Sequence, residues 1–141
     1  MKTASLIARR LLGIILLAFG LNGFLHFIPM PPPTGVAAQF LGAIFASGFW
    51  VVIFLLQIVP AVLLLLNRYV PLALTVLGPV IVNILFFHLF MAPAGLPLAL
   101  LVATLWIVVF RGVRSAFAGL FQQQVQGTTQ DVEPRLSAQL R

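Results

Sequence analysis

Residues Pro79 to Ala92, PVIVNILFFHLFMA, decide how the rest of this chain is interpreted. Asn83 and His88 carry the only side-chain hydrogen-bonding groups in this otherwise hydrophobic stretch. A polar side chain in hydrocarbon needs a partner, so such residues usually face the interior of a helix bundle and often mark function. The stretch therefore predicts a membrane helix that carries two polar residues of interest.

The composition around this stretch predicts an integral membrane protein. The 141 residues are 62% hydrophobic and 7% charged, whereas soluble domains carry about 25% charged residues. No Lys, Arg, Asp or Glu occurs between Arg10 and Arg68, or between Arg68 and Arg111. A span needs roughly 20 apolar residues, so these charge-free blocks are long enough to contain several spans.

The expected fold is an all-α membrane protein, with a four-transmembrane-helix bundle in residues 1–121. The spans cover about residues 11–28, 49–66, 71–91 and 96–110, and a helical extension of the last one could reach Phe121. Residues 36–47 form either a short interfacial helix between spans one and two or part of a long, tilted second span. Residues 122–141 lose hydrophobicity and are predicted to be a disordered cytoplasmic tail.

Small and turn-forming residues indicate how these spans meet. Gly13 and Gly20 share one side of the first span, where small residues let a neighbouring helix approach closely. Asn67 suits the C-terminus of the second span, and Pro71 suits the first turn of the third. The spans before and after this turn are therefore expected to be antiparallel neighbours.

Basic residues predict the orientation of the bundle. Lys2, Arg9 and Arg10 precede span one, and Arg68 lies between spans two and three. Arg111 and Arg114 follow span four, and the two opposite loops carry no charge. By the positive-inside rule both termini are cytoplasmic, in the inner membrane of a bacterium. Residues 1–27 also resemble a signal peptide, but their apolar run is longer than a usual signal core, which favours a retained span.

Several kinds of chemistry are excluded or disfavoured by composition. The net charge of +6 comes from residues that flank the spans, so it does not indicate nucleic-acid binding. Without cysteine there is no disulfide or thiolate chemistry. No carboxylate lies within a span, and two histidines are fewer than the usual three or four protein ligands of a metal. Haem is disfavoured because no Arg or Lys lies at the outer end to neutralise its propionates.

The candidate site consists of five polar residues within the spans: Asn22, His26, Gln57, Asn83 and His88. Counted from the cytoplasmic ends of their spans, Asn22 and Asn83 both lie about 16–18 Å deep. The two histidines lie roughly 23–26 Å deep, near the outer interface. We expect Asn83 to point inward beside Asn22 and His26. His88 lies five residues later, about 140° around the helix, and is expected at the rim, near span four or the proline loop.

Parts of the chain resemble the DoxX-like family of small four-span bacterial membrane proteins. The resemblance covers about residues 10–110 and rests on four pieces: Gly20-Leu21-Asn22 with Phe24 and His26-Phe27, the run Pro29–Pro33, Leu63–Leu74, and Pro79–Phe90. It implies a four-helix bundle in the bacterial inner membrane and a link to quinone or redox biology. Members of the family often carry Lys at the position of Gly23 and Glu at the position of Gln57, and this chain lacks both charges.

Two functional hypotheses follow. In the first, the protein is a non-catalytic accessory or assembly subunit, whose polar residues lock its own bundle or bind a membrane protein partner or a second copy. In the second, the five polar residues bind a quinone-like lipophilic ligand, because Asn and His can donate hydrogen bonds to quinone carbonyls in an apolar slot. The sequence contains no pattern typical of a catalytic centre.

Overall fold

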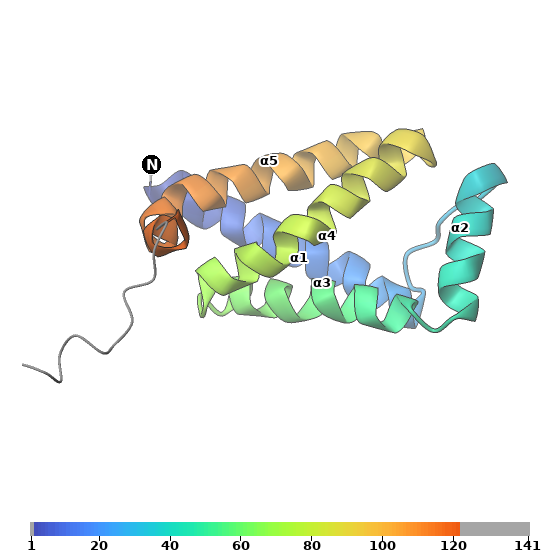
Figure 1. Ribbon diagram of the computed structural model, residues 1–141, viewed down its shortest axis with the longest axis horizontal. Helices are drawn as coiled ribbons and strands as arrows, with labels where there is room; N and C mark the ends of the chain where they lie inside the picture. The colour runs from blue at the N-terminus through green and yellow to red at the C-terminus, as the bar shows by residue number, and fades with distance from the viewer. Residues whose placement is uncertain (1, 122–141) are drawn as a thin grey trace, which may run out of the picture.

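The computed structural model describes residues 2–121, and in this part of the chain every regular element is a helix. Five α-helices, four of them long, make up most of it, and Figure 1 shows their arrangement. They are α1 (Lys2–Leu25), α2 (Gly35–Ala46), α3 (Trp50–Leu65), α4 (Val70–Phe90) and α5 (Leu96–Val113). Two short 3-10 helices, η1 (Pro93–Gly95) and η2 (Arg114–Phe121), precede and follow α5. The predicted tail, residues 122–141, lies outside the described residues.

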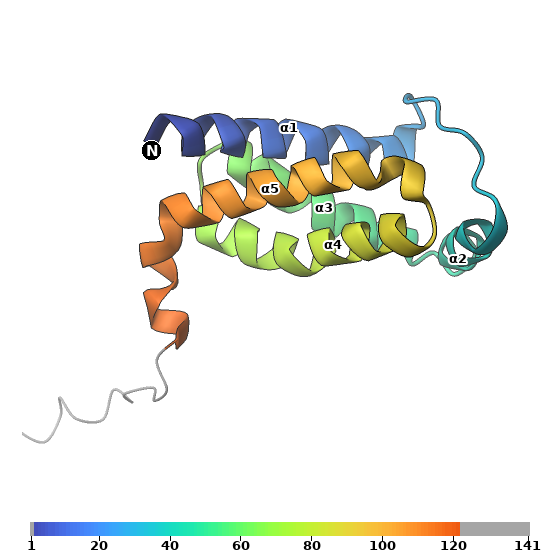
Figure 2. The same cartoon turned by 90° about the horizontal axis from the view of Figure 1, so that it is seen from above.

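The four long helices pack as a ring. Helix α1 packs against α3 and α5, and α4 packs against the same two helices from the other side. Successive helices run in opposite directions along the bundle, as Figures 1 and 2 show. The start of α1, the α3–α4 turn and the end of α5 therefore meet at one end of the molecule. The predicted all-helical bundle is confirmed.

In the described part of the chain, three helical segments are long and apolar enough to cross a membrane by themselves: Thr3–Leu25, Val70–Phe90 and Pro93–Gly119. The fourth candidate combines α2 with α3, and these two helices meet at an angle of 89°. Residues 36–47 therefore belong to a separate helix that lies across the end of the bundle (Figure 2), and the alternative of one long tilted span is wrong. Residues 2–121 thus contain three candidate spans, or up to four if the sharply bent pair of α2 and α3 is counted as one broken span.

Glycines on α1 allow α3 to approach closely, as the sequence predicts. A Cβ atom added to Gly13 would lie 2.8 Å from Leu65 Cγ and 3.2 Å from the Ala61 carbonyl oxygen. A Cβ at Gly20 would lie 2.7 Å from Ile58 Cγ1. Because real Cβ atoms do not approach other atoms this closely, these positions need residues without a side chain for the observed α1–α3 packing.

The α3–α4 turn is stabilised by its own backbone conformation and hydrogen bonds. Asn67 adopts a left-handed conformation with φ of +56°, which Asn tolerates better than most residues. Its N–H donates to the Leu64 carbonyl, and the Arg68 N–H donates to the Leu63 carbonyl at 3.0 Å. This pair of hydrogen bonds is the Schellman motif, which satisfies the free carbonyls at a helix end. Pro71 then lies in the first turn of α4, and the predicted roles of both residues are confirmed.

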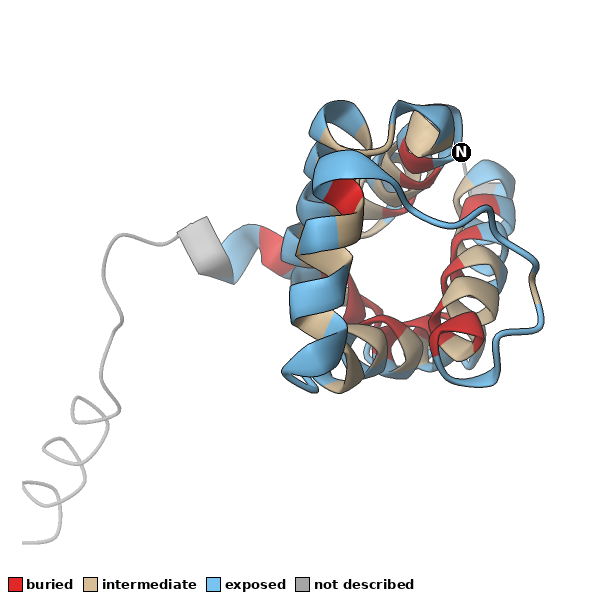
Figure 3. Cartoon of the chain, turned by 90° about the vertical axis from the view of Figure 1, so that its right-hand side faces the viewer, coloured by how far each residue is buried: buried red, intermediate tan, exposed pale blue. Residues whose placement is uncertain are grey.

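The buried residues lie where the helices face one another (Figure 3). The largest fully buried side chains are Leu12, Leu16, Leu64, Leu74, Leu77 and Val109. They come from all four long helices. Helix α1 contributes directly to this core through Leu12 and Leu16. It begins at Lys2 and ends at Leu25, rather than covering residues 11–28. The end at Leu25 follows from the left-handed φ of +52° at His26.

Candidate functional site

Asn22 and His26 build the end of α1 together. The N–H of His26 donates to the Asn22 carbonyl at 2.9 Å, and the left-handed backbone of His26 ends the helix. The Asn22 side chain is buried, and its Oδ1 accepts a hydrogen bond from the N–H of Ile28 at 2.6 Å. Asn22 thus fixes the chain as it leaves α1, whereas the His26 side chain is exposed.

Gln57 joins α3 to α1. Its side chain is 6% exposed, and its Nε2 donates to the Leu16 carbonyl oxygen at 2.9 Å. Leu16 lies near the middle of α1, so this hydrogen bond links the two helices in the interior of the bundle. The hydrogen bond of this amide is made within its own protein, as is usual for a buried polar side chain.

Asn83 points away from the bundle. Its side chain is exposed, whereas Leu77 and Ile81 on the same helix are buried. At 100° per residue, Asn83 lies about 160° around α4 from Ile81, which places it on the opposite face. The prediction that Asn83 points inward beside Asn22 and His26 is therefore wrong. Equal depth along two helices does not decide which way a side chain points around the helix.

The face around Asn83 has a second polar feature. Pro79 is exposed, four residues before Asn83, and it has no N–H to give to the Thr75 carbonyl in the preceding turn. The Thr75 hydroxyl donates to the Pro71 carbonyl at 3.0 Å and so stays within its own helix. Phe86 and Phe90 continue this face, 56% and 72% exposed. We call residues 75, 79, 83, 86 and 90 the outward face of α4.

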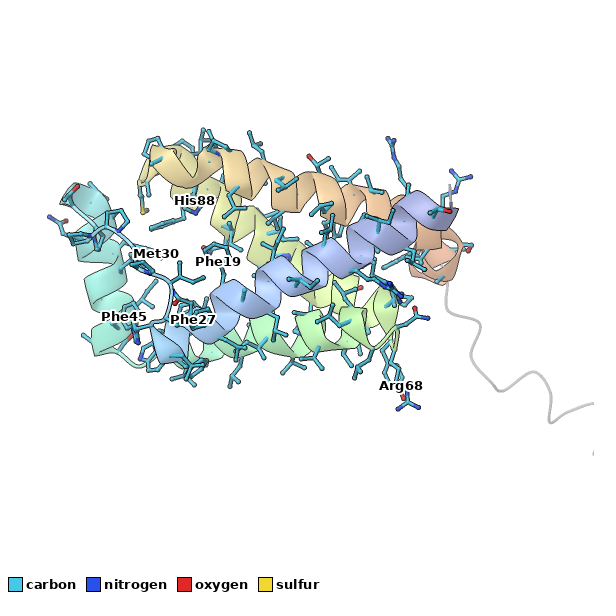
Figure 4. All side chains as sticks on the ribbon, turned by 180° about the vertical axis from the view of Figure 1, so that it is seen from behind. Phe19, Phe27, Met30, Phe45, Arg68 and His88 are labelled. Atoms are coloured by element: carbon cyan, nitrogen blue, oxygen red, sulfur yellow. The ribbon has the colours of Figure 1, made fainter. Side chains whose placement is uncertain are left out.

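His88 supports the turn between α4 and α5. Its Nδ1 lies 3.0 Å from the Ala92 carbonyl oxygen, at hydrogen-bond distance. Its ring packs against Gly95, where a Cβ atom would overlap the ring. The predicted position of His88 near the start of the fourth span is confirmed, and Figure 4 shows it at the end of the bundle opposite Arg68.

The five candidate residues do not form one common site in the structure. Asn22 and Gln57 are buried and make hydrogen bonds within the chain. His88 lies within hydrogen-bond distance of the Ala92 carbonyl. The His26 side chain is exposed at the end of α1, and the Asn83 side chain faces outward. Within residues 3–119, every buried side-chain nitrogen or oxygen has a hydrogen-bond partner. No group of three His, Asp or Glu residues that could hold a metal ion occurs in the same part of the chain. The shared ligand-binding role of the five residues stays a prediction.

Two hydrogen bonds between elements were not anticipated from the sequence. Trp106 Nε1 on α5 donates to the Leu74 carbonyl on α4 at 3.0 Å, and Arg9 Nη1 on α1 donates to Asn67 Oδ1 in the α3–α4 turn. A tryptophan in the middle of a span carries one N–H that needs an acceptor. The sequence could therefore have predicted that Trp106 makes a hydrogen bond, but not that Leu74 accepts it. Arg9 and Asn67 are 58 residues apart, and no pattern in the sequence pairs them.

Comparisons of the chain with protein-family models, with curated proteins and with solved structures find no match. The resemblance to the DoxX-like family therefore rests on the residue pieces quoted above and stays a prediction. What the protein does has to be inferred from its own side chains.

Proposed function

We propose that this protein is a non-catalytic accessory or assembly subunit of a bacterial inner-membrane system, and that the outward face of α4 binds a transmembrane helix of its partner. The observation that carries this proposal is the exposed Asn83 side chain within an apolar helix. About 13 residues from the start of α4, it would lie roughly 20 Å into the membrane. An amide at that depth is more stable with a hydrogen-bond partner than in contact with lipid.

The buried polar residues support a structural role for the rest of the site. Asn22 and Gln57 hold parts of this chain together, and none of the buried polar atoms in residues 3–119 lacks a partner. A quinone-like head group would need free donors that converge in one apolar slot. Gln57 already donates to the Leu16 carbonyl, Asn22 holds the chain after α1 through its side-chain carbonyl oxygen, and Asn83 points away from both. The three amides do not converge on one slot, so the geometry favours partner binding over the quinone alternative.

The proposed topology has four spans and two cytoplasmic termini. Arg9, Arg68, Arg111 and Arg114 belong to the segments that meet at one end of the bundle, and the described connections at the other end carry no Lys or Arg. The positive-inside rule supports a cytoplasmic location for the basic end. The resemblance to the DoxX-like family supports four spans in the bacterial inner membrane.

Photo-cross-linking in the native membrane tests the proposed face. A photo-reactive benzoylphenylalanine at Phe86, three residues from Asn83, reports on what covers the outward face without removing the amide. We expect adducts of protein size at Phe86 that are strongly reduced when Asn83→Leu is added. The same probe at Val59, 55% exposed on α3, is the matched control and should not respond to Asn83→Leu.

The outcomes separate the alternatives. If the probe at Phe86 captures only lipid, or if its protein adducts are unaffected by Asn83→Leu, the proposed role of this face is wrong. An adduct of twice the chain mass, formed by the purified protein alone, would identify the partner as a second copy. Saturable binding of a labelled quinone to the reconstituted protein would favour the ligand hypothesis instead.

A further inference from the structure

The basic end of the bundle contains an open hollow with a volume of about 530 Å³. It lies between the start of α1, the α3–α4 turn and the end of α5. These three segments are far apart in the sequence and meet in the folded chain. Its volume is in the range of about 300–1,000 Å³ that is common for small-molecule sites. The hollow is distinct from the five polar residues discussed above and from the outward face of α4.

The polar part of the hollow is basic. Arg9 and Arg111 line it, together with Ser5 and Asn67. Asn67 Oδ1 accepts a hydrogen bond from Arg9, and the Schellman turn fixes the backbone of Asn67. The guanidinium of Arg9 is thus positioned by its own protein, while Arg111 is exposed at the end of α5. Guanidinium groups are well suited to phosphate because they present several N–H donors in one plane.

The remaining lining is apolar. Leu6, Val70, Val109, Gly112 and Val113 form it. Leu6 on α1 is 42% exposed, whereas Val70 and Val109 are buried, so Leu6 and Val113 offer the accessible apolar surface. A ligand with a charged head and a hydrocarbon tail would match this combination, with its head at the arginines and its tail along the apolar wall. A free anion would use only the polar part.

The charge of the chain points to an anionic ligand. Residues 2–121 contain six Lys and Arg residues and no Asp or Glu, because the two acidic residues are Asp131 and Glu133. The arginines at this end therefore have no carboxylate partner within the described part of the chain. Basic pockets between membrane helices on the cytoplasmic side bind anionic lipid head groups.

We propose that the hollow binds the phosphate head group of one anionic phospholipid, held by Arg9 and Arg111, with its acyl chains along Leu6 and Val113. This inference does not depend on the partner-binding role of α4. It assigns Arg9 and Arg111 to a defined lipid site, whereas Arg10 and Arg114, which do not line the hollow, contribute only general surface charge.

Native mass spectrometry of the purified full-length protein tests this site. Phosphatidylglycerol and phosphatidylcholine with the same acyl chains are the two probes, and inorganic phosphate is the competitor. We expect one saturable phosphatidylglycerol per chain, weaker binding of phosphatidylcholine, and little competition by phosphate. Arg111→Gln removes charge-assisted hydrogen bonds and should weaken phosphatidylglycerol binding about tenfold or more. Arg114→Gln, with the same change of charge, should have a much smaller effect.

Further variants keep the test decisive. Arg9→Gln should weaken binding like Arg111→Gln, and if it fails to fold because the contact with Asn67 is lost, Arg111→Gln alone decides. Equal losses in Arg111→Gln and Arg114→Gln would mean general charge attraction and would overturn the proposal. Efficient displacement by phosphate would show an anion site rather than a lipid site. Binding that appears only after Asp131→Asn and Glu133→Gln are introduced would assign the hollow to the chain's own tail.

Discussion

At the scale of single residues, the direction of a polar side chain decides how its replacement should change the free energy of unfolding. Gln57 donates to a carbonyl on α1, and an interhelical hydrogen bond in a membrane contributes on average about 0.6 kcal/mol. Gln57→Leu should therefore lower the free energy of unfolding modestly. Asn83→Leu should leave it unchanged or raise it, because Asn83 faces outward and leucine is favourable in lipid. Unfolding of both variants by SDS in mixed micelles measures the two effects side by side.

The stabilities of Gln57→Leu and Asn83→Leu also test whether the two side chains lie where we describe them. A larger loss of stability in Asn83→Leu than in Gln57→Leu would mean that Asn83 has a partner inside the bundle. In that case the partner-binding face of α4 would have to be abandoned. The Asn83→Leu protein also serves the cross-linking experiment, so its stability is a needed control there.

Sequence reasoning identified the five polar residues but not their partners. Depth along a helix follows from counting residues, and the predicted position of His88 beside the start of α5 was confirmed. The direction of Asn83 was wrong because all sides of α4 are apolar, so no hydrophobic stripe in the sequence indicates its inner face. The bonds of Asn22 to Ile28 and of Gln57 to Leu16 depend on backbone positions, and residue types alone do not give these.

At the scale of elements, the packing of α1 on α3 depends on the absence of side chains at glycine positions. A Cβ atom at Gly23 would overlap the ring of Phe54, and this ring packs against Phe24 and Trp50. Gly23→Ala should therefore destabilise the protein by about 1–3 kcal/mol, the usual cost of overpacking. The same packing leaves no room for a lysine at this position.

Gly42 on α2 is the matched control for Gly23. Nothing lies within 4 Å of a Cβ atom added there, and alanine is a better helix former than glycine by about 1 kcal/mol. Gly42→Ala should be neutral or stabilising in the same unfolding experiment. A stabilising Gly23→Ala would show that α1 and α3 are further apart than described.

The order of the helices could be predicted in outline, because the length of an apolar stretch and the residues of a turn can be read from a short piece of sequence. Asn67 and Pro71 marked the α3–α4 turn, and the glycines marked the face of α1 that meets α3. The separate course of α2 was left open by the sequence, because the stretch is apolar on both sides of Gly48. In the structure Gly48 adopts a left-handed φ of +74°, and α2 and α3 meet at 89°. The start of α1 at Lys2 was missed because charged residues outside hydrocarbon can still be helical.

At the scale of the whole molecule, we propose that the bundle crosses the membrane four times with its basic end in the cytoplasm. The chain contains no cysteine, so single cysteines can be introduced without other changes. Ser47 and Ser115 are exposed near opposite ends of the bundle, and replacing serine by cysteine changes little in size. Tyr69, 71% exposed in the α3–α4 turn, reports on whether α3 crosses.

The decisive measurement is labelling of these three single-cysteine proteins in intact cells with a membrane-impermeant maleimide, followed by labelling after permeabilisation. We expect Ser47→Cys to react in intact cells, whereas Tyr69→Cys and Ser115→Cys should react only after permeabilisation. Labelling of Tyr69→Cys in intact cells would mean that α3 does not return to the cytoplasmic side. Labelling of Ser115→Cys in intact cells would contradict the proposed topology.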